Sequence, residues 1–479
     1  MNERLQEDLK RNRVIEVYPS WPFLSSPLGF TPKHDGGLRR IHHLSHPRGT
    51  SVNDYILGSS SSLNYVTFQT ILASIVTAGR GSTVMKRDIE AAFRNVPLAP
   101  HVQWLLGFSW EGRYYKEACL PFGLSTAPFI FNLFAEALHW IIQSFLHWPF
   151  LHHFLDDFIN IIPERLATPA YIQRTSDEYI RLTEILGIPR NDKKDMVGTV
   201  VPILGIEVDT TKFEARLPQD KLRRAIALTQ EAMQGHSMSL ASAQKLAGYL
   251  SFCALVVRLG WVFMRHIWTF LASFPHRASK HTRRRVPLDV QHDLQWWYNL
   301  LPTFNGTLFF TGISRETAHL YTDASGIGMG GFFHLEANQP NWQLLCHALD
   351  ESTAFATPLP TQEEGTVFDI NVHEVQAILI ALRKNAFNWK RYRVVIHTDS
   401  ATAQRGLRKN TLSGPANDPL RSILFLAAKH DILLQPEWIS GASNALADAL
   451  SRFDGTAVAN WCPHWQNSYT LRTPLHRGF

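Results

Sequence analysis

Hydrophobic and polar positions change their spacing along the chain. Residues 216–275 carry apolar side chains at helical spacing, as in LASAQKLAGYLSFCALVVRLGWVF, which predicts a mainly helical segment. In residues 313–454, short apolar runs that end in polar turns, such as HLYTDASG and VVIHTDS, alternate with helical patterns such as NVHEVQAILIAL. This alternation predicts a separate mixed α/β domain.

The first 215 residues are rich in strand and turn signals. The stretch SSPLGFTPKHDGGLRR predicts two strands joined by an Asp-Gly-Gly turn, and the apolar strand in STVMKRD ends at Asp88. Farther along, LHHFLDDFINII sets Asp156 and Asp157 side by side inside an apolar run. Taken alone, this pair fits an ordinary hairpin turn equally well, but a divalent cation shared with Asp88 would neutralise the repulsion between the carboxylates.

Composition limits the class of protein. At 479 residues and 45% hydrophobic content, the chain is long enough to bury the cores of several domains. A net charge of +6 and a pI near 9.1 favour an anionic partner, with nucleic acid first and an acidic membrane surface second.

The cysteine pattern and the apolar segments indicate in which cellular compartment the protein is expected. The four cysteines are far apart and form no C-x-x-C pair, which indicates neither a zinc module nor a disulfide framework. The N-terminal MNERLQEDLKRNRVIEV has no apolar segment of the kind found in signal peptides. The most apolar stretch, FCALVVRLGWVFMRHIWTFLASF, carries Arg258, Arg265 and His266, which predicts a buried or groove-facing helix and not a membrane span. We therefore expect an intracellular protein, cytoplasmic or nuclear, without a membrane partner.

Five motifs occur in the order KHDGGLRRI, DIEAAF, LPFGLSTAP, FLDDF and ILGIEV. The series resembles the fingers and palm motifs of reverse transcriptases. The resemblance implies a multidomain α/β and α+β fold, in which a right-hand polymerase is followed by an RNase H-like α/β domain. We expect fingers and palm at 1–215, a helical thumb at 216–275, a basic linker at 276–312, an RNase H domain at 313–454 and a C-terminal extension at 455–479.

The resemblance also implies nucleotidyl transfer with two Mg²⁺ ions per active site, Mn²⁺ being an alternative. The implied metal ligands are the carboxylates of Asp88, Asp156 and Asp157 and the backbone carbonyl of Ile89. Lys194 is the implied proton donor to pyrophosphate, although Lys193 is equally near. The implied nucleotide and primer contacts are Lys33 and Arg39 for the triphosphate, Phe93 as an aromatic gate against ribonucleotides, Phe122 and Gly123 of the LPFG loop, and Leu204 and Gly205 in the primer-gripping turn.

The segment 313–454 resembles an RNase H module. Its four acids in order are Asp323 in YTDAS, Glu374 in NVHEVQAI, Asp399 in HTDSAT and Asp448 in ALADALSR. The resemblance implies that they hold two metal ions for hydrolysis of an RNA strand. The short loop EWISGASNALADAL lacks the His that many family members carry there. The basic run at 277–285 is either a solvated loop or a source of affinity for the RNA/DNA hybrid.

Two segments, RRIHHLSHPRGTSVNDYI and SNALADALSR, resemble DIRS-like retrotransposon polymerases, the group that integrates through a tyrosine recombinase. We therefore expect an RNA-directed and DNA-directed DNA polymerase with RNase H activity. Its expected partners are RNA template, DNA primer, RNA/DNA hybrid and dNTPs. Two alternatives stay open: a domesticated nucleic-acid-binding protein without catalysis, and the polymerase of a long-terminal-repeat or pararetroviral element.

Overall fold

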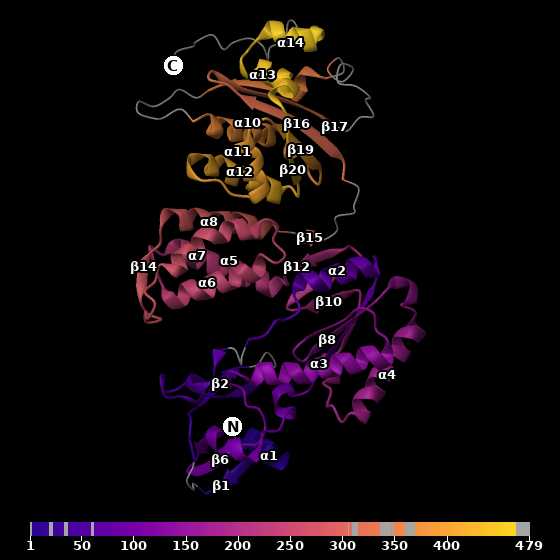
Figure 1. The fold of residues 1–479 in the computed structure, drawn as a ribbon, viewed down its shortest axis with the longest axis vertical. Coiled ribbons are helices and arrows are strands. Elements are labelled where there is room, and N and C mark those ends of the chain that lie inside the picture. Colours follow the sequence, from indigo (N-terminus) through magenta and orange to yellow (C-terminus); the bar gives the residue numbers. More distant parts are fainter. Residues whose placement is uncertain are drawn as a thin grey trace. The chain divides into compact units, whose positions relative to one another are not determined.

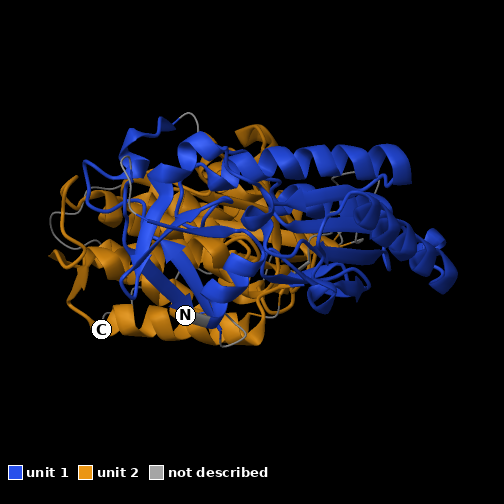
Figure 2. Cartoon of the chain, turned by 90° about the horizontal axis from the view of Figure 1, so that it is seen from below, with its two compact units in different colours: residues 1–215, 308–310 blue, residues 216–307, 311–479 orange. Residues whose placement is uncertain are grey.

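A computed structural model describes residues 2–18, 23–32, 37–58, 62–304, 306–308, 315–335, 346, 349–359 and 369–465. The chain divides into two units, shown in different colours in Figure 2. Unit 1 comprises Met1–Ala215 with Leu308–Phe310, and unit 2 comprises Arg216–Thr307 with Thr311–Phe479.

Unit 1 contains a four-stranded antiparallel sheet in the segment predicted as palm, called the palm sheet below (Figure 1). Its order is β7-β8-β4-β9, with β7 at Leu151–Phe154, β8 at Asp157–Ile162, β4 at Thr83–Asp88 and β9 at Met196–Gly198. Helices α2 (Phe68–Ala78), α3 (Ala127–Leu146) and α4 (Pro169–Ile185) accompany this sheet. Helix α3 buries Phe131, Ala135, Leu138 and Ile142, which recur at helical spacing, in one cluster with Phe158 of β8.

The other described strands of unit 1 form three further groups. Strands β1 (Val14–Val17), β6 (Arg113–Glu117) and β5 (Gly107–Trp110) form one sheet in that order. Strands β2 (Leu28–Pro32) and β3 (Leu38–His42) form the predicted hairpin. Helix α1 (Asn2–Lys10) buries Leu5 against Val14, Phe108 and Tyr115. Strands β10 (Val200–Ile203), β11 (Ile206–Asp209) and β12 (Glu214–Arg216) follow the palm sheet.

Unit 2 begins with a bundle of four α-helices (Figure 1): α5 (Gln219–Gln234), α6 (Leu240–Cys253), α7 (Arg265–Ala272) and α8 (Leu288–Leu300). The short strands β13 (Ser237–Ser239) and β14 (Arg283–Arg285) pair beside it. Helix α8 lies inside the stretch 276–312 that the sequence predicted as a linker, and it packs against α5 and α7. The physical reason is the apolar spacing of Val290, Leu294 and Trp297, which are buried on one face of the helix.

The rest of unit 2 is a five-stranded mixed sheet covered by helices. Its order is β18-β17-β16-β19-β20, with β16 at Thr317–Ala324, β17 at Gly328–Leu335, β18 at Ala354–Pro358, β19 at Arg393–Thr398 and β20 at Leu433–Trp438. Strand β16 pairs antiparallel with β17 and parallel with β19. The remaining helices are α10 (Ile370–Asn385), α11 (Ala401–Lys409), α12 (Asn417–Lys429), α13 (Ala445–Ser451) and α14 (Gly455–Trp461).

Successive side chains of this sheet point to opposite faces, and each face contributes to a different hydrophobic core. Ala318 and Leu320 pack with α10 and α12, whereas Tyr321 and Phe332 pack with α13 and α14. The expected mixed α/β multidomain fold is confirmed. Helix α14 shows that the predicted C-terminal extension continues the second core as far as Trp465.

One described helix, α3, is long and apolar enough to cross a membrane by length and composition. One face of α3 belongs to the core of the palm sheet, whereas Leu133, Trp140 and Phe145 on the helix are exposed. The apolar stretch noted in the sequence, 252–274, is divided between the end of α6, the 3-10 helix Gly260–Met264 and α7.

Candidate active sites

Three carboxylates gather at one end of the palm sheet. Asp88 ends β4 and lies directly opposite Asp157, the first residue of β8, in the antiparallel register. Leu155 adopts a left-handed conformation with φ of 51°, which closes the predicted hairpin tightly. The backbone N–H of Ile89 donates to the carbonyl of Asp156 at 3.1 Å and thereby ties the end of β4 to this hairpin.

Two lysines and partial burial determine the electrostatics of these acids. Lys194 Nζ donates to both carboxylate oxygens of Asp88 at 3.2 Å, and Lys86 Nζ lies 2.9 Å from Asp157 Oδ2. Burial raises the pKa of Asp88, opposed by Lys194, and burial likewise raises the pKa of Asp156. Hard divalent cations prefer carboxylate oxygens, so these acids suit such a cation in place of the protons, although the three do not bring one ligand oxygen each within 4.8 Å of one another.

A cleft of about 830 Å³ opens beside the acids within unit 1. Asp88, Asp156 and Lys194 line it, as do Arg39 of β3 and Phe122. The cleft therefore brings carboxylates and cations together in one space, which suits a ligand that carries phosphates and metal ions.

Phe122 forms part of the cleft wall, and Phe93 packs against it from the core. The Arg39 guanidinium lies 4.8 Å from the centroid of the Phe122 ring, and the rings of Phe122 and Phe93 are 5.0 Å apart. Gly123 has φ of +118°, and a Cβ there would lie 1.8 Å from the His42 carbonyl oxygen. Gly123 thus permits close approach of β3 to the LPFG loop.

Four of the predicted contacts, Phe93, Gly123, Leu204 and Gly205, do not line the cleft. Leu204 and Gly205 form the turn between β10 and β11, with φ of 48° and 80°. Lys33 lies outside the described residues.

A second acidic site lies in unit 2. Asp323 near the end of β16, Glu374 on α10 and Asp399 after β19 offer carboxylate oxygens within 4.8 Å of one another, the one such metal-ligating group found among the described residues. Burial first, and then the charges of Asp323 and Asp399, raise the pKa of Glu374 to about 8. Burial also raises the pKa of Asp323, to about 6.

Two carboxylate oxygens that lack a hydrogen-bond donor among the described residues make this triad suitable for a cation. Glu374 Oε2 and Asp399 Oδ1 are buried and have no hydrogen-bond partner in the described part of the chain. A buried carboxylate oxygen without a donor is costly, and coordination to a divalent ion supplies the missing partner.

The fourth predicted acid, Asp448, is near the triad but outside it. Its charge helps to raise the pKa of Asp323, behind burial and Asp399, while its carboxylate accepts from Arg452 Nε at 2.8 Å. The sequence reading missed Ser451, whose hydroxyl donates to Asp323 Oδ2 at 2.7 Å. The signal for it was helical spacing, because Ser451 follows Asp448 by three positions on α13.

Comparisons with known proteins bear on the segment that holds the first of these sites. Residues 32–206 match the family described as "Reverse transcriptase (RNA-dependent DNA polymerase)". "Protein P" of Duck hepatitis B virus (strain China) is 27% identical over 168 residues, 34% of this chain and 20% of the relative. The chain thus spans about a fifth of the length of that curated relative. The matched segment contains Asp88, Asp156 and Asp157, so the part of the chain that carries these acids is similar to reverse transcriptase domains.

Solved structures of viral enzymes resemble the chain at low identity. The foamy viral protease-reverse transcriptase in complex with dsDNA has a TM-score of 0.48 and 15% identity, covering 92% of this chain and 82% of that one. The same enzyme in complex with RNA/DNA hybrid has a TM-score of 0.46 and 14% identity, covering 91% and 53%.

Proposed function

We propose that this chain is a DNA polymerase that copies RNA and DNA templates, with a ribonuclease H activity in unit 2. The observation that carries the proposal is that Asp88, Asp156 and Asp157 lie together at the end of the palm sheet, beside a cleft that Arg39 also lines. The match of residues 32–206 to the reverse transcriptase family supports the same reaction.

In the proposed polymerase site, the three aspartates hold two Mg²⁺ ions, with the Ile89 carbonyl as a further ligand. When bound, these ions activate the primer 3′-hydroxyl and stabilise the leaving pyrophosphate. Arg39 and Lys33 bind the triphosphate as cations, and Lys194, already beside Asp88, donates a proton to pyrophosphate.

The aromatic pair of Phe93 and Phe122 selects the sugar in the same site. Phe93, which packs against Phe122, is the gate whose bulk disfavours a ribose 2′-hydroxyl. Leu204 and Gly205 grip the primer strand through a turn in which glycine allows close backbone approach.

In the proposed ribonuclease site, Asp323, Glu374 and Asp399 hold the divalent ions, with Asp448 as a fourth acid. When bound, these ions activate water and stabilise the charge that develops on the cleaved phosphate. Ser451 orients Asp323 through its hydroxyl hydrogen bond.

The proposed partners are RNA template, DNA primer, RNA/DNA hybrid and dNTPs. The narrower resemblance of RRIHHLSHPRGTSVNDYI and SNALADALSR favours a DIRS-like retroelement as the source, and an intracellular location, cytoplasmic or nuclear, is part of the same proposal. The net charge of +6 supports a polyanionic partner.

Primer extension on a labelled RNA template tests the proposal, with Mg²⁺ or Mn²⁺ and with DNA synthesis and RNA cleavage scored together. We expect Asp156→Asn to stop synthesis and spare cleavage, and Asp399→Asn to do the reverse. An unaltered chain that does neither with either metal would instead support a binding protein without catalysis.

A further inference from the structure

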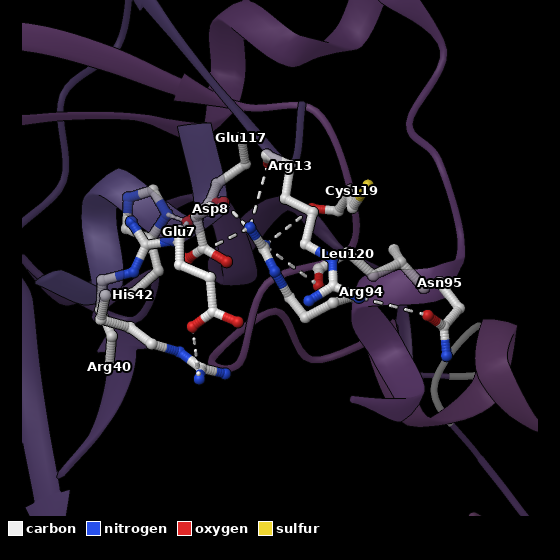
Figure 3. A network of polar contacts seen from close by, with 11 residues as sticks. Glu7, Asp8, Arg13, Arg40, His42, Arg94, Asn95, Glu117, Cys119 and Leu120 are labelled. Atoms are coloured by element: carbon white, nitrogen blue, oxygen red, sulfur yellow. Dashed lines mark hydrogen bonds and ion pairs between the residues drawn. The ribbon is translucent and has the colours of Figure 1, made fainter. Parts of the chain in front are cut away.

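A buried network of charges joins helix α1 to the strands beside the nucleotide cleft (Figure 3). Arg40 Nη2 of β3 lies 3.0 Å from Asp8 Oδ2 of α1 and 3.1 Å from Glu117 Oε1 of β6. Arg94 Nη1 lies 2.7 Å from Glu117 Oε2, and Arg94 Nη2 lies 3.8 Å from Asp8 Oδ2. All four side chains are at most 8% exposed, so water screens these charges little.

Arg94 connects this network to the backbone. Its guanidinium donates to the carbonyls of Arg13 at 3.0 Å, Cys119 at 3.3 Å and Leu120 at 3.5 Å. The Arg94 side chain thus holds two backbone segments in place: the residues just after α1 and the residues that lead into the LPFG loop. A planar guanidinium with five fixed donors is suited to such a role.

Three of the implied nucleotide contacts, Arg39, Phe93 and Phe122, adjoin the network. Arg39 precedes Arg40 on β3, and alternation along a strand sends Arg40 into the network while Arg39 lies over the Phe122 ring. Phe93 directly precedes Arg94. Phe122 follows Leu120 by two positions, and its carbonyl accepts from the His42 backbone N–H at 2.7 Å.

In the network two carboxylates face the guanidinium groups of Arg40 and Arg94, and buried Arg13, which interacts electrostatically with both Asp8 and Arg94, adds a third positive charge. Neutralising Asp8 leaves Arg40 and Arg94 buried with the single carboxylate of Glu117 between them. Like charges in a region of low dielectric repel strongly, so one of the two arginines must move. Movement of either one shifts the backbone that carries Arg39 or Phe93.

We propose that Asp8 is a positioning residue for the incoming nucleotide. Helix α1 then contributes to nucleotide binding at the polymerase site. The Asp8 carboxylate holds Arg40 and Arg94, and through them the cation Arg39 and the aromatic pair of Phe93 and Phe122. Asp8 also lines the cleft itself. The inference rests on the proposed polymerase function.

Steady-state primer extension at varied dNTP concentration tests the inference with Asp8→Asn. We expect the KM for dNTP to rise about tenfold and kcat to change less than about twofold, because the reacting carboxylates lie on other strands. The KM for primer–template and the RNA cleavage by unit 2 stay unchanged. Glu7→Gln is the matched control, because Glu7 is on the same helix, 40% exposed, and pairs with Arg4 and Arg11; its KM for dNTP equals that of the unaltered chain.

The double variant Asp8→Asn with Arg40→Gln separates positioning from simple charge compensation. It removes one buried positive charge along with the negative one, yet also removes the contact that holds β3, so the KM for dNTP stays raised. Recovery of the original KM in the double variant, or an unchanged KM in folded Asp8→Asn, overturns the inference. Thermal unfolding of each variant establishes that it is folded at the assay temperature.

Equilibrium binding of dTTP to the chain, measured in the presence of primer–template and Ca²⁺, tests the role of Asp8 separately from the proposed polymerase function. An unaltered chain that binds dTTP but never extends the primer contradicts the polymerase function alone. In that case Asp8→Asn still tests the inference, through an expected loss of dTTP affinity of about tenfold. Equal dTTP affinity of the two chains overturns it.

Discussion

Asp88 and Asp157 face each other as paired residues of two antiparallel strands, β4 and β8. Like charges directly opposite each other in a sheet are destabilising, and here a third acid, Asp156, lies beside them. Lys86 and Lys194 each reach one of the facing carboxylates. The end of the palm sheet therefore keeps a locally unfavourable arrangement, which is typical of a site selected for chemistry and not for stability.

The first prediction separates activity from stability at this site. Asp88→Asn lowers the rate of primer extension by about 10³-fold and leaves the melting temperature unchanged or higher, because it removes a partly buried charge. Asp195→Asn is the contrasting variant, since Asp195 pairs with buried Arg87 at 2.5 Å. It lowers the free energy of unfolding by about 3 kcal/mol. Circular dichroism melts and primer extension on both variants check this, and a large melting-temperature loss in Asp88→Asn would contradict it.

The second prediction concerns the close approach at Gly123. Gly123→Ala destabilises unit 1 by about 3 kcal/mol or more, because its Cβ would lie 1.8 Å from the carbonyl oxygen of His42 in addition to the strain of a positive φ. Gly112→Ala is the control, with φ of +76° and no atom within 4 Å of the added Cβ. It costs about 1 kcal/mol. Equal losses in urea unfolding of the two variants would show that the contact with β3 does not matter.

The acids of both sites could be proposed from the sequence because strand ends and helical turns place Asp88, Asp157, Asp323 and Glu374 regardless of distant packing. Helix α8 was harder to predict, since a run of basic residues ahead of it resembles a linker and only the spacing of Val290, Leu294 and Trp297 indicates the helix. Asp8 could not be predicted as a buried residue. It lies in a polar N-terminal helix, and its partner Arg40 is 32 positions away.

The third prediction tests the triad of unit 2 through stability. Mg²⁺ raises the melting temperature of unit 2, because binding to the folded state alone stabilises it, by about 2.7 kcal/mol at a hundredfold excess over Kd. Glu374→Gln loses this increase, since it removes a buried oxygen that has no hydrogen-bond partner among the described residues. Glu437→Gln, an exposed acid of β20, retains it. Calorimetry with and without Mg²⁺ measures both, and a persistent Mg²⁺ effect in Glu374→Gln would place the ion elsewhere.

The fourth prediction is a pH dependence in unit 1. Burial lowers the pKa of His42 below its ordinary value of 6.5, opposed by Glu117. Below that value the unfolded chain binds a proton that the folded chain does not, so the free energy of unfolding falls with falling pH, by at most about 1.4 kcal/mol per pH unit. His42→Gln reduces this slope. Urea unfolding between pH 5 and about 7.5 measures it, and an identical slope in the variant would assign the proton to another group.

The last prediction concerns Phe93, which packs behind the cleft wall. Phe93 packs on Phe122 at 5.0 Å and on Phe131 at 5.7 Å, so its ring is held from two sides. If this rigid ring excludes a ribose 2′-hydroxyl, Phe93→Val opens space where the hydroxyl would lie. We expect the ratio of kcat/KM for dNTP over rNTP to fall by about 10²-fold, mainly through faster rNTP incorporation. Phe134→Val, which alters a neighbouring ring packed on Phe131, is the control and keeps the ratio. A lower dNTP rate in Phe93→Val without any gain for rNTPs would mean that Phe93 supports the wall but does not select the sugar.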